Sequence, residues 1–172
     1  MGQLRCSGKV KLFVGLLSSD KALFQKVKKV LEKIFGPVDF ESDMLEFTHT
    51  DYYAQELGAN LKRKFLSFER RIGLKNIYKV KLRTNLLEKH FSKSGKRSVN
   101  IDPGYVDLSK VVLFSTKDYS HRIYLNNGIF AEATLFYKNK KFNPWPWTYP
   151  DYKSQAYVSI LNLIRDIYKN QS

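Results

Sequence analysis

The sequence predicts an α+β fold, a single domain in which a mostly antiparallel sheet is covered by about three helices. Three observations support this prediction. A continuous apolar run lies near the start of the chain, apolar residues recur at helical spacing in three separate segments, and short strands with strong turn signals fill residues 99–137. The order strand, helix, strands, helix, meander, helix is typical of helices packed on an antiparallel sheet.

The first two elements are expected to be a buried strand and an amphipathic helix. Val10 to Leu17 is a continuous apolar run, which predicts a central strand buried on both faces. Ser19 or Asp20 is expected to cap a helix that runs to Phe35 and ends at Gly36-Pro37. Its predicted apolar stripe consists of Leu23, Val27, Val30, Leu31 and Ile34.

The next segment is expected to contain short strands followed by a second helix. One or two short strands are predicted around Met44 to Phe47, and another strand at Phe65 to Ile72. The basic cluster Lys62-Arg63-Lys64 is expected to lead into that strand. The second helix is predicted from about Leu74 to Phe91, with an inner side made of Tyr78, Leu82, Leu86, Leu87 and Phe91.

Turn signals then introduce the meander. Val99 to Ile101 is predicted to be a brief strand. Asp102-Pro103-Gly104-Tyr105 carries proline and glycine at the positions that a type II turn favours. Lys110 to Thr116 is predicted to be the next strand.

A hairpin and a last helix complete the chain. His121 to Leu125 and Ile129 to Tyr137 flank Asn126-Asn127-Gly128, a strong hairpin signal. The loop from Asn143 to Tyr149 is expected to be stiff because prolines fix its backbone. A helix is predicted from about Ser154 to Tyr168, burying Tyr157, Leu161, Ile164 and Tyr168.

Length and composition indicate one domain with its own core. The chain has 172 residues, of which 43% are hydrophobic and 15% aromatic. We expect a loose segment at residues 1–8 and a single α+β domain over residues 9–170. The one cysteine, Cys6, has no partner for an internal disulfide, and no apolar run approaches the ~20 residues of a membrane helix. A cytoplasmic location with no membrane attachment is therefore expected.

The charge distribution is strongly uneven. The net charge is +14, and residues 61–97 hold 13 basic and 2 acidic side chains, whereas residues 37–60 hold 6 acidic and no basic ones. A basic surface raises the local concentration of anions such as nucleotides or nucleic acid. The alternative reading is a lysine-rich surface that is simply well solvated.

Eight sequence blocks, in order, resemble a known family. The blocks are KLFVGL, FGPVDFES, TDYY, KRKFLSFER, VNIDPGY, KDYSHRIYL, AEATL and PWTYPDY. Together they resemble a bacterial family of uncharacterised proteins, domain of unknown function 4416, over about Lys11 to Tyr168. The resemblance implies a stand-alone bacterial cytoplasmic protein and no particular reaction. Some members of that family carry the label GTP-binding protein.

The residues argue against a P-loop GTPase. A P-loop needs G-x-x-x-x-G-K-[ST], so that backbone amides and a lysine can hold the phosphates. The nearest string is Gly95-Lys96-Arg97-Ser98. The upstream glycine position holds His90, and Arg97 stands before the serine. Literal P-loop chemistry is therefore not expected.

Candidate catalytic residues lie at predicted strand ends and turns. His121 follows Asp118 at a strand entrance, and a nearby carboxylate would orient its ring and raise its basicity. It could act as a general base or, when protonated, bind a phosphate. Asp102 is the third candidate, at its predicted turn. The structural alternative is that His121 and Asp102 only stabilise their own turns.

Glu132 is the fourth catalytic candidate. On an alternating strand it faces away from the alanines on either side of it. If that face is buried, Glu132 needs a cationic partner, for which Arg122 and Lys110 are candidates. If the face is exposed, Glu132 is an ordinary solvated residue.

Basic and aromatic side chains are the candidates for ligand binding. A basic cluster could hold phosphates, and exposed aromatic rings could stack on bases. The alternatives are a solvated basic rim and an aromatic plug that packs on the sheet edge. The candidate ligand-binding residues are Lys62, Arg63, Lys64, Lys110, Tyr119, Arg122 and Trp147.

The leading hypothesis is a protein that binds a phosphate-bearing ligand, a nucleotide or nucleic acid. Its pocket would be formed by the 102–105 turn, residues 118–121 and Glu132. The first alternative is a small hydrolase or transferase that uses His121 with an acid partner, and the second is a non-catalytic protein-interaction module. No histidine, cysteine or acid spacing matches a known metal motif, so no metal site is predicted, and the residues indicate no particular cofactor.

Overall fold

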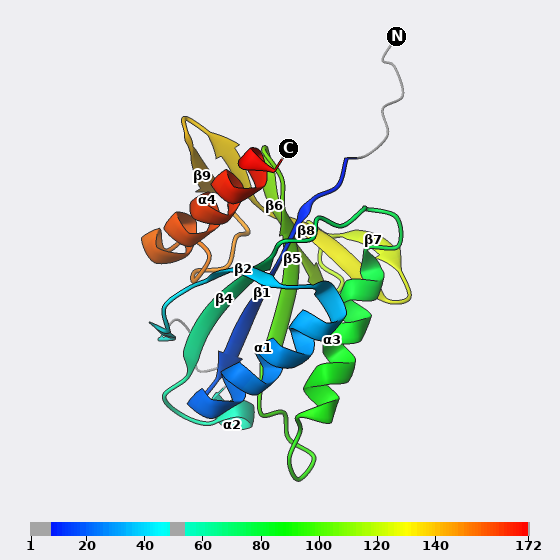
Figure 1. The fold of residues 1–172 in the computed structure, drawn as a ribbon, viewed down its shortest axis with the longest axis vertical. Coiled ribbons are helices and arrows are strands. Elements are labelled where there is room, and N and C mark those ends of the chain that lie inside the picture. Colours follow the sequence, from blue (N-terminus) through cyan, green and yellow to red (C-terminus); the bar gives the residue numbers. More distant parts are fainter. Residues whose placement is uncertain (1–7, 49–53, 172) are drawn as a thin grey trace.

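The computed structural model describes residues 8–48 and 54–171. Its strands are β1 (Lys11–Ser18), β2 (Val38–Glu41), β3 (Leu45–Glu46), β4 (Lys62–Phe68), β5 (Asn100–Val106), β6 (Lys110–Ser115), β7 (Ile123–Asn126), β8 (Ile129–Lys138) and β9 (Lys141–Pro144). Its helices are α1 (Lys21–Phe35), α2 (Ala54–Leu57), α3 (Tyr78–His90) and α4 (Gln155–Asn170) (Figure 1).

One antiparallel sheet contains all the strands of the described residues. The order across it is β2-β4-β1-β5-β6-β8-β7, with β3 beside β4 and β9 beside β8. Every strand pair is antiparallel, from the β1–β4 pair to the β8–β9 pair. The predicted fold class, an antiparallel sheet covered by about three helices, is confirmed.

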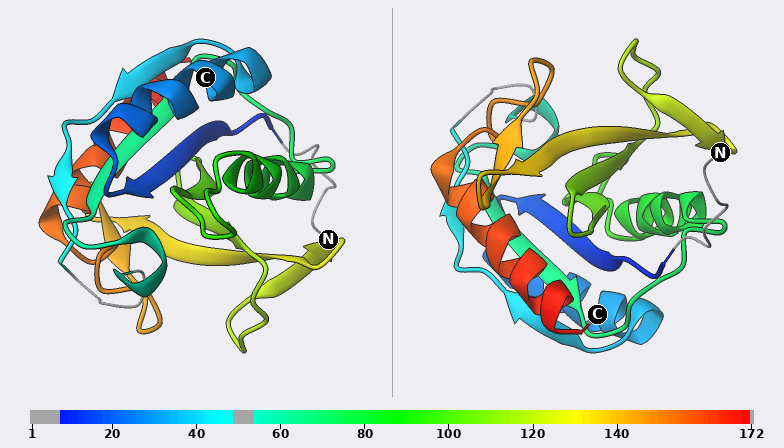
Figure 2. Two further views of the ribbon diagram at one scale, coloured as in Figure 1. Left: turned by 90° about the horizontal axis from the view of Figure 1, so that it is seen from below. Right: turned by 90° about the horizontal axis from the view of Figure 1, so that it is seen from above.

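Helices cover both faces of the sheet. Figure 2 shows α1 and α3 on one side of the curved sheet and α4 on the other. Val14 of β1 belongs to the core formed with α1 and α3, whereas Phe13 belongs to the core formed with α4. Because neighbouring residues of a strand point to opposite faces, β1 contributes to both cores. All of its residues are buried, as its continuous apolar run predicts.

The predicted starts of α1 and α4 are confirmed by their caps. The Asp20 side chain accepts a hydrogen bond from the Ala22 backbone N–H, and Ser154 accepts one from the Tyr157 N–H. The hairpin between β7 and β8 is also confirmed. Asn127 and Gly128 have φ of 49° and 71°, the left-handed values that such a tight turn requires.

The start of β4 corrects the predicted role of the basic cluster. The strand begins at Lys62 and ends at Phe68, so Lys62-Arg63-Lys64 lies within it and pairs with Leu16 to Ser18 of β1. The pleat separates the three side chains. Lys62 and Lys64 pair with Glu46 and with Glu41, whereas Arg63 points to the opposite face and is buried. The cluster is therefore not one basic patch.

The predicted turn at Asp102 to Tyr105 is wrong. These residues are part of the continuous strand β5, which pairs with β1 from Asn100 to Val106. A Cβ at Gly104 would lie 2.4 Å from the Val112 carbonyl oxygen and 2.8 Å from the Phe13 ring. Glycine is thus required here for close packing between strands and not for a turn.

The predicted inner side of the second helix also needs correction. α3 begins at Tyr78, and its buried residues are Val80, Lys81, Thr84 and Glu88. Leu86, predicted to be buried, is 64% exposed. The other predicted inner residues, Tyr78, Leu82, Leu87 and Phe91, are partly buried at the side of the core. The helix therefore turns a largely polar face toward the sheet.

Two further findings concern the ends of the domain. Tyr157, Leu161 and Ile164 of α4 are buried as expected, and Tyr168 is partly buried. Of the expected loose segment at residues 1–8, only Gly8 lies within the described residues.

In the described parts of the chain, no helix is both long and apolar enough to span a membrane.

Candidate functional site

The candidate site is a cleft where β5 and β6 separate. These two strands pair only from Gly104 to Val106 with Val111 to Leu113. Beyond Gly104, β5 pairs with β1 alone, and beyond Leu113, β6 pairs with β8 alone. A cavity of about 880 Å³ opens in this region.

Side chains of α3 form hydrogen bonds with backbone groups of β5 that have no partner on β6. Lys81 Nζ donates to the Ile101 carbonyl oxygen at 3.0 Å, and Glu88 Oε1 accepts from the Ile101 N–H at 2.6 Å. The two residues lie seven positions apart, two turns along one face of the helix. Burial raises the pKa of Glu88, and nearby Lys81 and the Ile101 N–H offset this only in part. Buried polar side chains thus make the backbone hydrogen bonds that a neighbouring strand would otherwise make.

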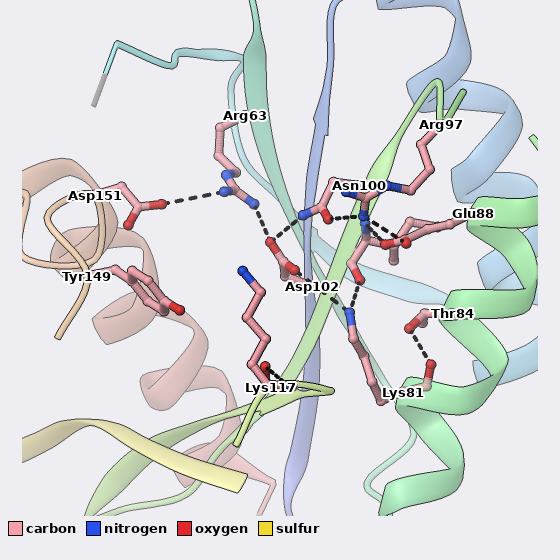
Figure 3. Close-up of polar contacts among 12 residues, drawn as sticks. Arg63, Lys81, Thr84, Glu88, Arg97, Asn100, Asp102, Lys117, Tyr149 and Asp151 are labelled. Atoms are coloured by element: carbon pink, nitrogen blue, oxygen red, sulfur yellow. Dashed lines mark hydrogen bonds and ion pairs between the residues drawn. The ribbon is translucent and has the colours of Figure 1, made fainter. Parts of the chain in front are cut away.

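Arg63 and Asp102 form the centre of the cleft (Figure 3). Arg63 Nη1 lies 3.2 Å from Asp102 Oδ2, and Arg63 Nη2 lies 3.4 Å from Asp151 Oδ2. Arg63 Nε also donates to the Tyr157 hydroxyl at 3.2 Å. Burial by itself would lower the pKa of Arg63, but Tyr157 and the two carboxylates raise it above its ordinary value. Arg63 therefore stays charged inside the protein.

A second arginine holds the far side of this cluster. Arg97 Nη1 donates to Asn100 Oδ1 at 3.0 Å and to Glu88 Oε2 at 3.2 Å, and the other nitrogens of Arg97 bind both oxygens of Glu56. Asn100 in turn donates to Asp102 Oδ2 at 2.6 Å. Figure 3 shows Lys117 pointing toward Asp102 from beyond the end of β6. The charged groups thus form one connected network.

The opposite wall of the cavity carries Glu132, which is 1% exposed. It accepts a hydrogen bond from Arg122 Nε at 2.9 Å, and His121 Nε2 lies 3.1 Å from the same oxygen. The reading of Glu132 as a buried acid paired with Arg122 is confirmed. Lys110, the other suggested partner, pairs with Asp107 at 2.7 Å instead.

Aromatic rings surround Arg122. Its Nη2 donates to the Tyr149 hydroxyl at 2.8 Å, and its Cζ lies 4.6 Å from the centre of the Tyr119 ring. Tyr119 and Tyr149 line the cavity and are 48% and 41% exposed. Their exposure puts them at its opening.

The structure brings together only some of the predicted site residues. Asp102, Glu132, Arg63, Tyr119 and Arg122 line the cavity. Of the four residues predicted to form one pocket, Asp102 and Glu132 line the cavity, whereas Asp118 and His121 do not. Whether any of these residues acts in binding or catalysis stays a prediction.

The remaining predicted residues lie outside the cavity lining for identifiable reasons. Asp118 is exposed in the turn after β6. The His121 ring stacks on Trp147, with ring centres 5.6 Å apart. The lysines that were expected to bind a ligand are engaged elsewhere, with Lys62, Lys64 and Lys110 paired to Glu46, Glu41 and Asp107.

Several residues of the cleft were not predicted from sequence. Two patterns indicate them in retrospect: Lys81 and Glu88 share one helical face, and Asn100 and Asp102 share one strand face. The positions of Arg97 and Tyr152 in the cleft have no comparable local signal. Among the described residues, no group of three or more histidine, cysteine or acidic side chains could hold a metal ion.

Comparison with known proteins identifies a family and gives no activity. The family model described as domain of unknown function (DUF4416) matches residues 8–168. No curated protein and no solved structure matches the chain. Because the family match covers nearly the whole chain, the protein belongs to the family described as domain of unknown function (DUF4416).

Proposed function

We propose that this protein binds a small phosphate-bearing ligand, of the nucleotide class, in the cleft between β5 and β6. The observation that supports this proposal is the charge of the cavity lining. Among the described residues, six basic side chains line the cavity against four carboxylates. The basic residues are Arg63, Lys81, Lys89, Arg97, Lys117 and Arg122, and the acids are Glu88, Asp102, Glu132 and Asp151.

The paired acids leave a positive excess for an anion. Arg63 lies between Asp102 and Asp151, Lys81 forms an ion pair with the other oxygen of Asp102, and Arg122 pairs with Glu132. Lys89 and Lys117 are exposed and belong to different segments, the last turn of α3 and the loop after β6. Two ammonium groups that reach one cavity from separate segments can bind oxygens of the same phosphate group.

The size and the aromatic opening of the cavity favour a nucleotide-sized ligand. Its volume of about 880 Å³ lies within the range of about 300–1,000 Å³ that is usual for small-molecule sites. Tyr119 and Tyr149 at the opening present rings on which a base can stack. Nucleic acid, suggested by the net charge of +14, would instead bind along an extended surface.

Binding can be tested with two lysines at opposite ends of β6. Lys117 lines the cavity, whereas Lys110 at the start of the strand pairs with Asp107 and does not. We expect nucleoside mono- and triphosphates to raise the melting temperature of the wild type by several degrees. Lys117→Met should weaken their binding about tenfold or more in isothermal titration, because a charged hydrogen bond is lost, and Lys110→Met should not.

Other outcomes would reject the proposal. If neither inorganic phosphate nor any nucleotide binds the wild type, the cleft is not a phosphate site. If only single-stranded RNA or DNA binds, and Lys117→Met and Lys110→Met weaken it equally, the basic surface and not the cleft is responsible.

The two alternative functions stay predictions with weaker geometric support. His121 contacts Glu132, as a catalytic base with an acid partner would, but its ring is stacked on Trp147 outside the cavity lining. The hydrolase or transferase hypothesis requires that His121→Ala abolishes turnover without unfolding the protein. The interaction-module hypothesis requires a protein partner that is captured in the presence of nuclease.

A further inference from the structure

We propose that the inner part of the cleft recognises a vicinal pair of hydroxyl groups on the ligand. The ligand would then be a phosphate ester of a sugar that keeps both hydroxyls, such as a ribonucleotide but not a deoxyribonucleotide. This inference rests on the proposed function, because it names the ligand class for the same cleft. Two residues carry it, Tyr152 and Asp102.

Tyr152 places a buried hydroxyl group at the cavity. The residue lines the cavity and is 3% exposed, and its hydroxyl makes no hydrogen bond to any described residue. Burial raises the pKa of Tyr152 well above its ordinary value, and Arg63 offsets this only in part. The hydroxyl is therefore protonated at neutral pH. Unsatisfied buried hydroxyls are rare because each costs about 1–3 kcal/mol.

Asp102 keeps an acceptor for the ligand. Its Oδ2 accepts hydrogen bonds from Arg63 and Asn100. Its Oδ1 has Lys81 Nζ at 3.8 Å, which is too long for a hydrogen bond, and accepts none from the described residues. A quarter of the side chain is exposed, and the residue lines the cavity.

Gly15 leaves space beside Arg63 and the Tyr152 hydroxyl. It lies beside Asp102 in the sheet, and a Cβ there would lie 3.1 Å from Arg63 Nη1 and 3.5 Å from the Tyr152 hydroxyl oxygen. A Cβ there would press on Arg63 and would fill the space next to the Tyr152 hydroxyl. The absence of a side chain at residue 15 thus allows the Tyr152 hydroxyl to approach the Arg63–Asp102 pair.

The two groups match the chemistry of a diol. A carboxylate oxygen accepts a hydrogen bond from one hydroxyl, and a tyrosine hydroxyl can donate to or accept from its neighbour. Acidic side chains bind ribose hydroxyls in this way in dinucleotide sites. A ligand that lacks one hydroxyl leaves a buried polar group unpaired, so such a site discriminates against the deoxy analogue.

The test compares sugars on the wild type and on Tyr152→Phe. The probes are ribonucleoside 5′-monophosphates, their 2′-deoxy counterparts, ribose 5-phosphate and inorganic phosphate, measured by isothermal titration. We expect the wild type to bind a ribonucleotide about tenfold more tightly than its deoxy counterpart. Tyr152→Phe should abolish this preference, whereas the control Tyr124→Phe, on the exposed strand β7, should keep it.

Tyr152→Phe is suited to this test because it should fold normally. It removes a hydroxyl that bonds no described residue and keeps the ring that packs on Phe65 and Tyr157. We expect its melting temperature to equal or slightly exceed that of the wild type. A residue with only a structural role would not change the preference between ribo and deoxy ligands.

The probes separate the possible results. Tight binding of ribose 5-phosphate identifies a free sugar phosphate as the ligand class, and binding of ribonucleotides alone identifies a nucleotide. Equal binding of ribo and deoxy forms, or a preference that survives in Tyr152→Phe, would overturn the diol inference and leave phosphate binding intact. If no phosphate-bearing probe binds at all, the proposed function itself fails.

Discussion

The two halves of the β5–β6 pair differ in what holds them. In the closed half, Gly104 to Val106 pair with Val111 to Leu113. There the backbones of Gly104 and Val112 pack closely, and apolar side chains such as Phe13 fill the space beside them. In the open half, β5 before Gly104 has no hydrogen bonds to β6. Side chains of α3 and two arginines lie there instead. One half is thus held by close packing and the other by charge pairs.

This difference indicates which half serves a ligand. Replacing a buried ion pair by apolar residues is often neutral or stabilising, so a network of buried charges is weak evidence for stability. Clustered and perturbed ionisable groups in a cleft are more typical of functional sites. The open half carries such groups, for example Glu88 and Tyr152, whose pKa values burial raises. We therefore expect the two halves to respond differently to mutation.

The largest effect is expected from breaking the charge network at its centre. Arg63→Met leaves the partly buried Asp102 and the buried Asp151 without their shared cation, and we expect it to destabilise the protein by about 3–5 kcal/mol. The matched control is Lys64→Met, one residue further on the other face of β4, which should cost about 1 kcal/mol or less. Urea unfolding measures both. Equal losses would mean that the network is no more critical than an ordinary ion pair.

A methyl group added to glycine distinguishes the two halves directly. Gly104→Ala places a Cβ 2.4 Å from a backbone oxygen that cannot move easily, and we expect a loss of about 3 kcal/mol. Gly15→Ala, beside the open half, meets side-chain atoms of Arg63 at 3.1 Å, Phe65 at 3.3 Å and Tyr152 at 3.5 Å. These can shift slightly, so a loss of about 1 kcal/mol is expected. The reverse order in thermal unfolding would contradict the assignment of the tightly packed half.

The pH dependence of stability should have opposite signs at two glutamates. Burial raises the pKa of Glu88 above 4.5, so the folded protein holds this proton more tightly than the unfolded chain. The Glu88 contribution to stability is therefore present at acid pH and is lost as pH rises through the folded pKa. For Glu41, burial is outweighed by hydrogen bonds from Lys28 and Lys64, which lower its pKa below 4.5. Its contribution is present above 4.5 and is lost as pH falls through the lowered pKa.

Two glutamine variants test these signs. As pH falls from 7 to ~4, across the ordinary carboxyl range, the wild type should become more stable relative to Glu88→Gln. It should become less stable relative to Glu41→Gln over the same interval. Chemical denaturation at several pH values measures both. Movement in the same direction would show that Glu88 is not a buried acid with a raised pKa.

The same contrast explains how much of the molecule could be predicted from sequence. β1, α1, the β7–β8 hairpin and α4 were predictable because each depends on local signals, such as the apolar run at Val10 to Leu17 and the cap at Asp20. Asp102-Pro103-Gly104 has the local chemistry of a turn, but pairing with β1 keeps it extended. That outcome depends on contacts distant in sequence, which local patterns do not contain.

The open half was poorly predictable for the same reason. Arg63 looks like part of a surface cluster until its position in β4 points it away from Lys62 and Lys64. Lys81 and Glu88 look like surface residues until the open backbone of Ile101 gives them partners. Hydrophobic periodicity cannot find a helix face that is buried through polar contacts.

The smallest expected effect tests the corrected face of α3. Leu86 has the apolar character of a core residue but is 64% exposed, so Leu86→Ser should change the unfolding free energy by less than about 0.5 kcal/mol. Val80→Ser, on the buried side, removes packed methyl groups and buries a hydroxyl, and should cost about 2 kcal/mol. A large loss for Leu86→Ser would mean that this leucine is covered in solution. In that case α3 would present an apolar face on the side away from the cleft, and a binding partner would cover that face in solution.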